Sequence, residues 1–311
     1  MRMRSHARPP CRVPRVRALI TGGKGFVGQW LAAHLKDRGD DVAVIDLETD
    51  VADGAAVGRV MRDVLPDAMY HLAAMTHVGE SWEHPSQVLR VNVLGTAEIL
   101  AAARAATPQA RVLVVSSAEV YGVVTPEQLP LSEATPTAPA SPYAASKQAA
   151  EVVSLQAWRG YGQPVVVVRP FNHIGPGQSP NFSVPAMAKR IVEANRSGAA
   201  SLRVGTLTTR RDFTDVRDVV AAYRLLIERG QTGEVYNVCS GVDVAMSDVA
   251  AQLLALAGAD LTLETDPELV RPVDVPVLRG DAAKLRAATG WEPSIPLATT
   301  LADVLASWAA D

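Results

Sequence analysis

The chain has 311 residues, of which 48% are hydrophobic and 20% are charged. This balance excludes a disordered, collagen-like or low-complexity protein, and the length allows one large α/β domain or two joined domains. No stretch approaches the roughly 18 uninterrupted apolar residues of a membrane span, so we expect none.

The charge is unevenly distributed along the chain. Residues 1–17 hold six arginines and no acidic residue, which leaves 24 basic and 33 acidic residues in the remainder, a net charge of −9. An acidic body argues against nucleic acid as a partner, because nonspecific binding requires a basic face. Residues 1–16 contain three prolines and lack a secretory apolar run, so we expect a disordered basic leader there.

Cysteine and histidine usage limits the possible sites further. The two cysteines, Cys11 and Cys239, and the six scattered histidines show no metal-ligand spacing, so no metal is expected. So few cysteines do not support a disulfide framework and fit a cytoplasmic protein.

Short apolar runs alternate with helical periodicity through the first 170 residues. Strands are expected at 17–21, 42–46, 68–73, 111–117 and 164–169, and helices at 26–38, 54–65, 86–106 and 142–161. This βα alternation predicts an α/β fold with a doubly wound, parallel Rossmann sheet.

The pattern is looser in the second half. Residues 171–183 are rich in Gly, Pro and Asn and hold no convincing element; helices are expected at 184–195, 215–229, 246–257 and 298–309, and strands at 201–204 and 234–238. We therefore expect a dinucleotide-binding domain over 17–170, to which 205–238 returns. A smaller, interleaved C-terminal substrate-binding lobe would comprise 171–204 and 239–311.

A glycine-rich loop follows the first expected strand. Gly22, Gly25 and Gly28 have the spacing G-x-x-G-x-x-G and lead directly into a helix. Glycine permits the tight turn and lets backbone N–H groups approach a pyrophosphate, and the helix N-terminus adds partial positive charge. The context predicts a dinucleotide site rather than a plain turn.

Asp46 ends the second expected strand, 18 residues after Gly28. A carboxylate there can accept hydrogen bonds from the adenosine ribose and would repel a 2′-phosphate, which slightly favours NAD(H) over NADP(H). Asp50 and Val51 could flank the adenine. Because several acids follow closely, a solvated turn carboxylate remains the alternative for Asp46.

A Tyr/Lys pair opens the helix expected at 142–161. Tyr143 and Lys147 are four residues apart, hence on one helix face. An adjacent ammonium would stabilise the phenolate and lower the pKa of Tyr143. A hydroxyl at Ser116 or Ser117, where the fourth strand ends, could orient a substrate oxygen beside the tyrosine. These residues suit alcohol–ketone redox chemistry with a nicotinamide cofactor.

The glycine loop, His71-Leu72-Ala73-Ala74, the run Ser116–Gly122 and the run Ser141–Lys147 together identify a resemblance. From about residue 16 to 309 the chain resembles the extended short-chain dehydrogenase/reductases that act on nucleotide sugars. The resemblance implies that Ser117 is the catalytic hydroxyl and that a homodimer forms through the helices at 86–106 and 142–161. The cofactor contacts expected on this basis are Gly22, Gly25, Phe26, Val27, Gly28, Asp46, Asp50, Val51, Leu72, Ala73, Ala74, Tyr143, Lys147 and Pro170.

Motifs of the second half look most like GDP-4-dehydro-6-deoxy-D-mannose reductases. They are the runs 169–178, 211–218, 237–241 and 270–276. By resemblance, Asn172, Arg211 and Arg271 would hold the diphosphate of a nucleotide sugar, and arginine forks do match phosphate oxygens. His77 and Asn181 are further candidate substrate contacts. The expected reaction is reduction by NAD(P)H of the C4 ketone of a nucleotide-linked 4-dehydro-6-deoxyhexose.

Two features keep other reactions open. Glu119 lies two residues before Tyr121, where related dehydratases place an acid/base, although a structural role is an equal alternative. The loop around His77 is also similar to the dehydratase form. A 4,6-dehydratase of the GDP-mannose type or a 4-epimerase, each retaining NAD, is therefore the alternative enzyme. A non-catalytic dinucleotide sensor is the alternative from another class.

Overall fold

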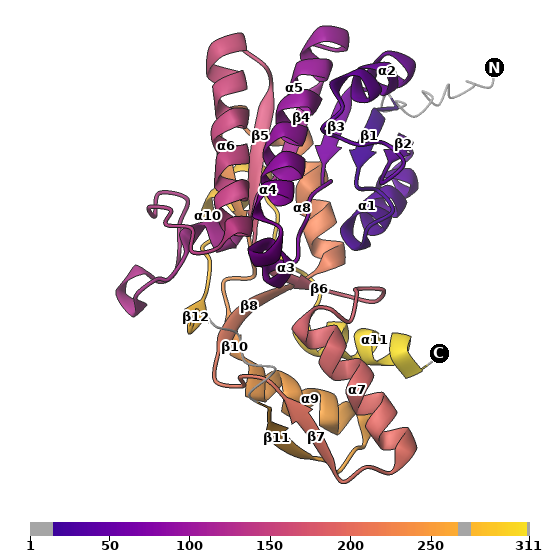
Figure 1. The fold of residues 1–311 in the computed structure, drawn as a ribbon, viewed down its shortest axis with the longest axis vertical. Helices are drawn as coiled ribbons and strands as arrows, with labels where there is room; N and C mark the ends of the chain where they lie inside the picture. The colour runs from indigo at the N-terminus through magenta and orange to yellow at the C-terminus, as the bar shows by residue number, and fades with distance from the viewer. Residues whose placement is uncertain (1–14, 267–274, 310–311) are drawn as a thin grey trace, which may run out of the picture.

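A computed structural model describes residues 15–266 and 275–309, and Figure 1 shows their arrangement. Within these residues a six-stranded sheet runs in the order β2-β1-β3-β4-β5-β9, with every neighbouring pair parallel. The strands are β1 (Arg17–Thr21), β2 (Asp41–Ile45), β3 (Ala68–His71), β4 (Arg111–Val115), β5 (Val165–Pro170) and β9 (Val235–Val238). The predicted parallel α/β sheet is confirmed.

Helices cover both faces of this sheet. The first face packs against α1 (Phe26–Asp37) and α8 (Val216–Arg229), and the second against α2 (Gly54–Val64), α5 (Gly95–Ala106) and α6 (Pro142–Tyr161). Strand β1 shows why: Ala18 and Ile20 belong to the core of one face, and Leu19 to that of the other. Strands buried on both faces have continuous apolar sequences, which explains the four consecutive valines of β5.

The helix expected at 86–106 is confirmed as one helical segment, but a π turn interrupts its α-helical hydrogen bonding. The segment forms α4 (Pro85–Leu89), a π-helical turn (Arg90–Leu94) and α5, and is preceded by α3 (Val78–Glu83). The π turn carries the buried Asn92, whose amide binds both the N–H and the carbonyl of Met75, at 2.8 and 3.0 Å. Because these two bonds hold Asn92 to Met75, in the loop that follows β3, the helix adopts a wider π turn at this position.

The second half builds a smaller lobe, seen at the bottom of Figure 1. Its helices α7 (Ser183–Ser197), α9 (Met246–Ala257) and α11 (Leu297–Ala309) share one apolar cluster and lie beside the paired strands β7 (Ser201–Val204) and β11 (Thr262–Thr265). A second sheet joins β6 (Asn172–Ile174), β8 (Arg210–Asp215), β10 (Asp243–Ala245) and β12 (Val277–Leu278). The prediction that 171–183 holds no element was wrong, because β6 pairs in parallel with β8.

Two segments depart from the expected lobe boundaries. Strand β8, within 205–238, belongs to the second sheet and not to the central one. Helix α10 (Ala283–Thr289) follows β12, and Leu285 and Trp291 are buried in the core shared with α8. Part of 239–311 therefore packs on the central sheet. Residues 1–14 of the expected leader and Arg271 lie outside the described residues.

Candidate functional site

A cleft of about 1910 Å³ opens between the carboxyl ends of the parallel strands and the smaller lobe. Strand β2 lies on one side of β1, and the chain then crosses over to place β3 on the other side. A topological switch point therefore lies at β1. Ligands of doubly wound sheets bind outside the strand ends at such a point.

The glycine loop forms the cleft wall after β1. Gly22 has a φ of +70°, and a Cβ there would lie 2.8 Å from the backbone nitrogen of Ala73; a Cβ on Gly28 would lie 2.3 Å from the carbonyl oxygen of Gly22. Only glycine fits these approaches. The first turn of α1 begins with the uncharged Phe26 and Val27, which border the cleft. Its N–H groups and dipole fit a dinucleotide pyrophosphate.

Asp46 lies at the tip of β2 and is engaged with the glycine loop. Its carboxylate accepts the N–H of Lys24 at 2.7 Å and that of Leu47 at 2.9 Å. The ammonium of Lys24 pairs with Glu48 at 2.9 Å, which places a cation and two acids at this end of the cleft. Asp50 is paired with Arg90 and, with Val51, also lines the cleft.

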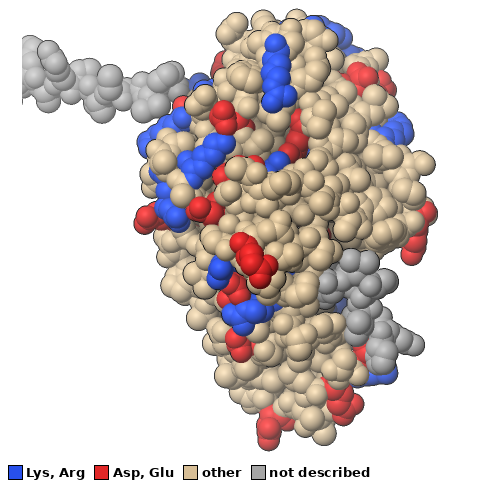
Figure 2. All heavy atoms as spheres, turned by 90° about the vertical axis from the view of Figure 1, so that its left-hand side faces the viewer, with Lys and Arg blue, Asp and Glu red and all other residues tan. Residues whose placement is uncertain are grey.

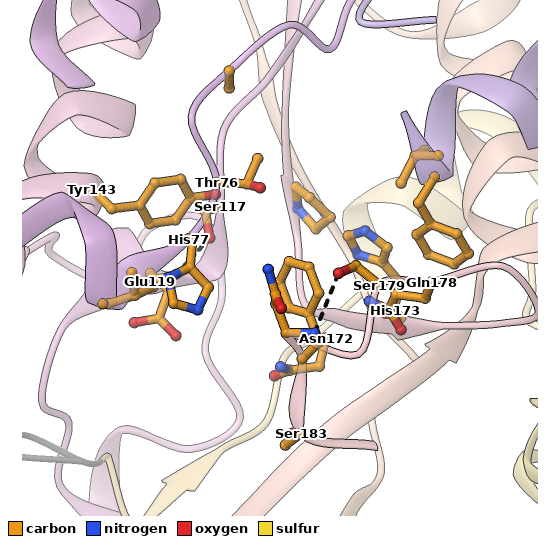
Figure 3. Close-up of a pocket in the computed structure, with 18 of the residues that line it drawn as sticks. Thr76, His77, Ser117, Glu119, Tyr143, Asn172, His173, Gln178, Ser179 and Ser183 are labelled. Carbon is orange, nitrogen blue, oxygen red and sulfur yellow. Dashed lines mark hydrogen bonds between the residues drawn. The ribbon is translucent and has the colours of Figure 1, made fainter. Parts of the chain in front are cut away.

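The residues expected to be catalytic meet at one wall of the cleft, from β4 and α6. Figure 3 shows Ser117, Tyr143 and Glu119 on one side, with Thr76 and His77. Pro142 stands at the first helical position of α6, and the Ser141 hydroxyl caps this helix by accepting the N–H of Ala144. The cap fixes the residue at which α6 begins, and it thereby fixes the position of Tyr143 in the first turn.

Burial is the main cause of the pKa shifts of Tyr143 and Lys147. It raises the pKa of Tyr143 to about 12, an effect that a hydrogen bond with Ser117 reduces and the charge of Glu119 increases. Burial also lowers the pKa of Lys147 to about 8, and the carboxylate of Glu151 opposes this change. Lys147 donates to the Val115 carbonyl at 2.8 Å, and its Nζ lies 5.9 Å from the centre of the tyrosine ring. The expected lowering of the Tyr143 pKa by Lys147 is not found in this geometry.

Glu119 lies in a 3₁₀ turn (Ala118–Tyr121) that follows β4 directly. Its backbone N–H donates to the Ser117 hydroxyl at 3.2 Å, so the turn also orients the serine. Its carboxylate acts on Tyr143 through its charge.

Most of the candidate substrate contacts lie on the opposite wall, whereas His77 lies on the Tyr143 wall. Asn172 and His173 come from β6 and face the Tyr143 wall in Figure 3. His77 caps α3, and its ring meets the edge of Phe182 at 6.5 Å between centroids. Asn181 and Arg211 also line the cleft, and an Nη of Arg211 donates to the Val275 carbonyl at 2.6 Å. Every described residue of the predicted site therefore borders this one cleft.

The sequence interpretation missed Asn92 as part of the site's framework. Its amide also donates to the Ser146 hydroxyl at 2.9 Å, between Tyr143 and Lys147 in sequence. The available signal was a polar side chain inside an otherwise apolar helical face. Within 15–266 and 275–309 no cluster of three His, Cys, Asp or Glu could hold a metal, and no helix there is long and apolar enough to cross a membrane.

Comparison with known proteins decides the family. The family model described as GDP-mannose 4,6 dehydratase matches residues 47–304. The chain belongs to this family. It is 37% identical to a GDP-6-deoxy-D-mannose reductase of Pseudomonas aeruginosa over 94% of this chain and 97% of that protein.

Solved structures agree. The structure of RMD from Pseudomonas aeruginosa complexed with NADPH matches with a TM-score of 0.88 and 37% identity, covering 95% of this chain and 98% of that one. The Thermus thermophilus UDP-glucose 4-epimerase complexed with NAD matches with a TM-score of 0.84 and 29% identity, covering 94% and 98%. The chain is therefore an extended short-chain dehydrogenase/reductase of the nucleotide-sugar enzymes.

Proposed function

We propose that this protein reduces the C4 ketone of a nucleotide-linked 4-dehydro-6-deoxyhexose, with GDP-4-dehydro-6-deoxy-D-mannose as the substrate. The convergence of Ser117, Tyr143 and Lys147 at the mouth of a dinucleotide cleft carries this proposal. The 37% identity to a GDP-6-deoxy-D-mannose reductase supports the choice of reaction and substrate.

Each of these residues has a distinct task. A nicotinamide dinucleotide, when bound, would supply the hydride. Ser117 orients the ketone oxygen, and Tyr143 donates its phenolic proton to the alkoxide oxygen that forms there. A phenol with a pKa near 12 is fully protonated at neutral pH, as a proton donor must be. We propose that Lys147, in its ammonium form, would stabilise the phenolate that remains by approaching it more closely than the 5.9 Å between its Nζ and the ring centre in this structure.

The smaller lobe would hold the rest of the substrate. We assign to it residues 171–204 and 239–311, apart from the α10 segment that packs on the central sheet. Asn172, Asn181 and Arg211 line its side of the cleft, and His77 lines the Tyr143 side; these four are the proposed contacts to the nucleotide sugar. Arg211 would meet the diphosphate, since a guanidinium matches phosphate oxygens.

The Tyr143→Phe variant tests the reductase against a dinucleotide sensor. Turnover should fall by about 10²–10⁴, the range of general acid catalysis, while NADH affinity stays within about threefold. Circular dichroism and thermal unfolding provide the folding control. Unchanged turnover in this variant would refute the assigned role of Tyr143.

Glu119 supports a second candidate, an NAD-retaining 4,6-dehydratase or 4-epimerase. Its carboxylate is close enough to Tyr143 to act on the pKa of that residue and can serve as an acid/base. Mass spectrometry of nucleotide released from denatured protein separates the candidates. Stoichiometric NAD would favour the second candidate, whereas a freely exchanging cofactor favours the reductase.

We propose that NADH is preferred slightly to NADPH, because the carboxylate of Asp46 would repel a 2′-phosphate. Lys24, held by Glu48 next to Asp46, moderates this preference. The variant Asp46→Asn should raise kcat/KM for NADPH relative to NADH by about fivefold, as expected for roughly 1 kcal/mol of charge repulsion in water. An unchanged ratio would remove Asp46 as the determinant.

We also propose a homodimer, formed through α4, the π turn, α5 and α6, that works in the cytoplasm. Leu89, Leu94 and Val152 on these elements are 46%, 45% and 63% exposed. Figure 2, viewed from the side on which α6 lies in Figure 1, shows a broad area with few charged side chains. Such surfaces favour association. Light scattering should show a dimer that the Leu94→Arg variant converts to monomers.

A further inference from the structure

A buried ion pair lies directly behind the candidate catalytic residues. Glu151 of α6 and Arg169 of β5 have side chains only 5% and 8% exposed, and they form a two-point contact with N–O distances of 2.9 and 2.7 Å. The hydroxyl of Ser116, next to Ser117, donates to the same carboxylate at 2.5 Å. Such a pair is costly to desolvate and is weak support for stability, so its retention calls for another reason.

Three successive turns of α6 bind the end of β4. Tyr143, Lys147 and Glu151 are spaced by four residues and so share one helix face. Tyr143 bonds to Ser117, Lys147 to the Val115 carbonyl and Glu151 to the Ser116 hydroxyl. Glu151 is the member of this series farthest from the cleft, and its contact fixes the register of the helix against the strand.

The guanidinium extends the same network to the turn that carries Glu119. Arg169 donates through its remaining terminal nitrogen to the Tyr121 hydroxyl at 3.1 Å, and Tyr121 donates to Asn237 of β9 at 2.7 Å. Tyr121 closes the 3₁₀ turn that starts after Ser117. The ion pair thus connects both segments that present catalytic side chains.

The titratable groups that face Lys147 come from three elements, β3, α6 and β5. His71 of β3 is neutral at working pH, because burial and the charge of Lys147 lower its pKa to about 3. Tyr143 is neutral as well. Glu151 is the carboxylate whose charge raises the pKa of Lys147, and Arg169 of β5 faces that carboxylate from the far side.

We propose that Glu151 and Arg169 form a positioning pair for the reaction, which holds Tyr143 in register with Ser117 and keeps Lys147 in its ammonium form. Neither residue touches the cleft, so the pair acts through the residues that do. The expected change in kcat rests on the proposed function. The expected change in the titration of Lys147 rests on the geometry alone.

The Glu151→Gln variant tests the pair. Activity that needs the ammonium form is lost as pH rises through the pKa of Lys147, so removal of the carboxylate should move this alkaline loss to lower pH by about one unit. We expect kcat to fall about tenfold, with KM for NADH changed less than about threefold, because positioning acts on the transition state.

A second variant covers the possibility that an unpaired buried guanidinium prevents folding. Glu151→Leu combined with Arg169→Met replaces the pair by apolar groups, which proteins tolerate well. It should show an alkaline shift in the same direction but smaller, because the opposing charge of Arg169 is removed together with the carboxylate. Asp40→Asn is the matched control: it breaks the Asp40–Arg224 pair, whose side chains are 6% and 15% exposed, on the far face of the sheet. It should lower the melting temperature without moving the pH profile.

The titration of Lys147 separates this inference from the proposed function. In ¹⁵N-lysine-labelled protein, the Lys147 ammonium should titrate about one pH unit lower in Glu151→Gln than in the wild type. Absence of ketoreductase turnover in the wild type would refute the function alone, because the NMR titration needs no substrate. An unmoved Lys147 titration in both variants would refute the positioning pair and leave a structural ion pair only.

Discussion

The substitution Gly28→Ala places a Cβ 2.3 Å from the carbonyl oxygen of Gly22 and 2.6 Å from the Cα of Gly23. An ordinary carbon–oxygen contact is about 3.3 Å or more, so the loop must retreat by about 1 Å from the start of α1. Both obstacles are backbone atoms, which cannot rotate away. Forcing an extra methyl into a packed site costs about 1–3 kcal/mol, which corresponds to a loss of about 5–150-fold in cofactor affinity.

Fluorescence titration with NADH measures this loss directly. The control is Gly58→Ala in α2, where the new Cβ would meet only the mobile end of Arg62 at 3.4 Å. That variant should keep the wild-type affinity and gain about 0.5–1 kcal/mol of stability, because glycine weakens a helix interior. If Gly28→Ala bound NADH within threefold of the wild type, the close approach of the loop to α1 would not be what shapes the cofactor site.

Three further perturbations test the framework. Burial alone would raise the pKa of Asp215, but its hydrogen bonds, led by that from Arg217, lower this pKa below its ordinary value. The stability that the Asp215 carboxylate adds is therefore present above about pH 4 and is lost as the pH falls. The melting temperature of Asp215→Asn should depend less on pH between about 5 and 3 than that of the wild type. Trp291→Ala should cost about 3–5 kcal/mol in urea unfolding, since the ring is 3% exposed, and a loss below about 1 kcal/mol would contradict its place in the core. Asn92→Ala leaves the N–H of Met75 without its acceptor and should cost about 1–3 kcal/mol, and unaltered stability would show that the π turn does not depend on this amide.

The strand and helix alternation of the first 170 residues could be predicted from the sequence because its signals are local. Apolar runs such as Val165–Val168 and the start signals of α6 lie within a few residues of one another. The same holds for the spacing of Gly22, Gly25 and Gly28 and for the Tyr143/Lys147 pair, each set by a single loop or helix turn.

The short strands of the second half could not be predicted in this way. β6, β10 and β12 have two or three residues each, too few for a period to show, and they exist because β8 offers hydrogen-bonding partners. Likewise, the π turn after Leu89 depends on the hydrogen bond from Asn92 to the carbonyl of Met75, which lies in a different segment. Sequence periodicity carries no information about a partner supplied by a distant segment.

Local patterns along the chain are enough to predict the fold class, the dinucleotide loop and which residues meet at the strand ends. How those residues are charged and held depends on the folded molecule. The acid that supports Lys147 is joined to Arg169, 18 residues away, and Arg169 to Tyr121, 48 residues away. Burial, which sets the pKa of Tyr143 and Lys147, is a property of the assembled core, because it arises only when segments far apart in the chain exclude water together.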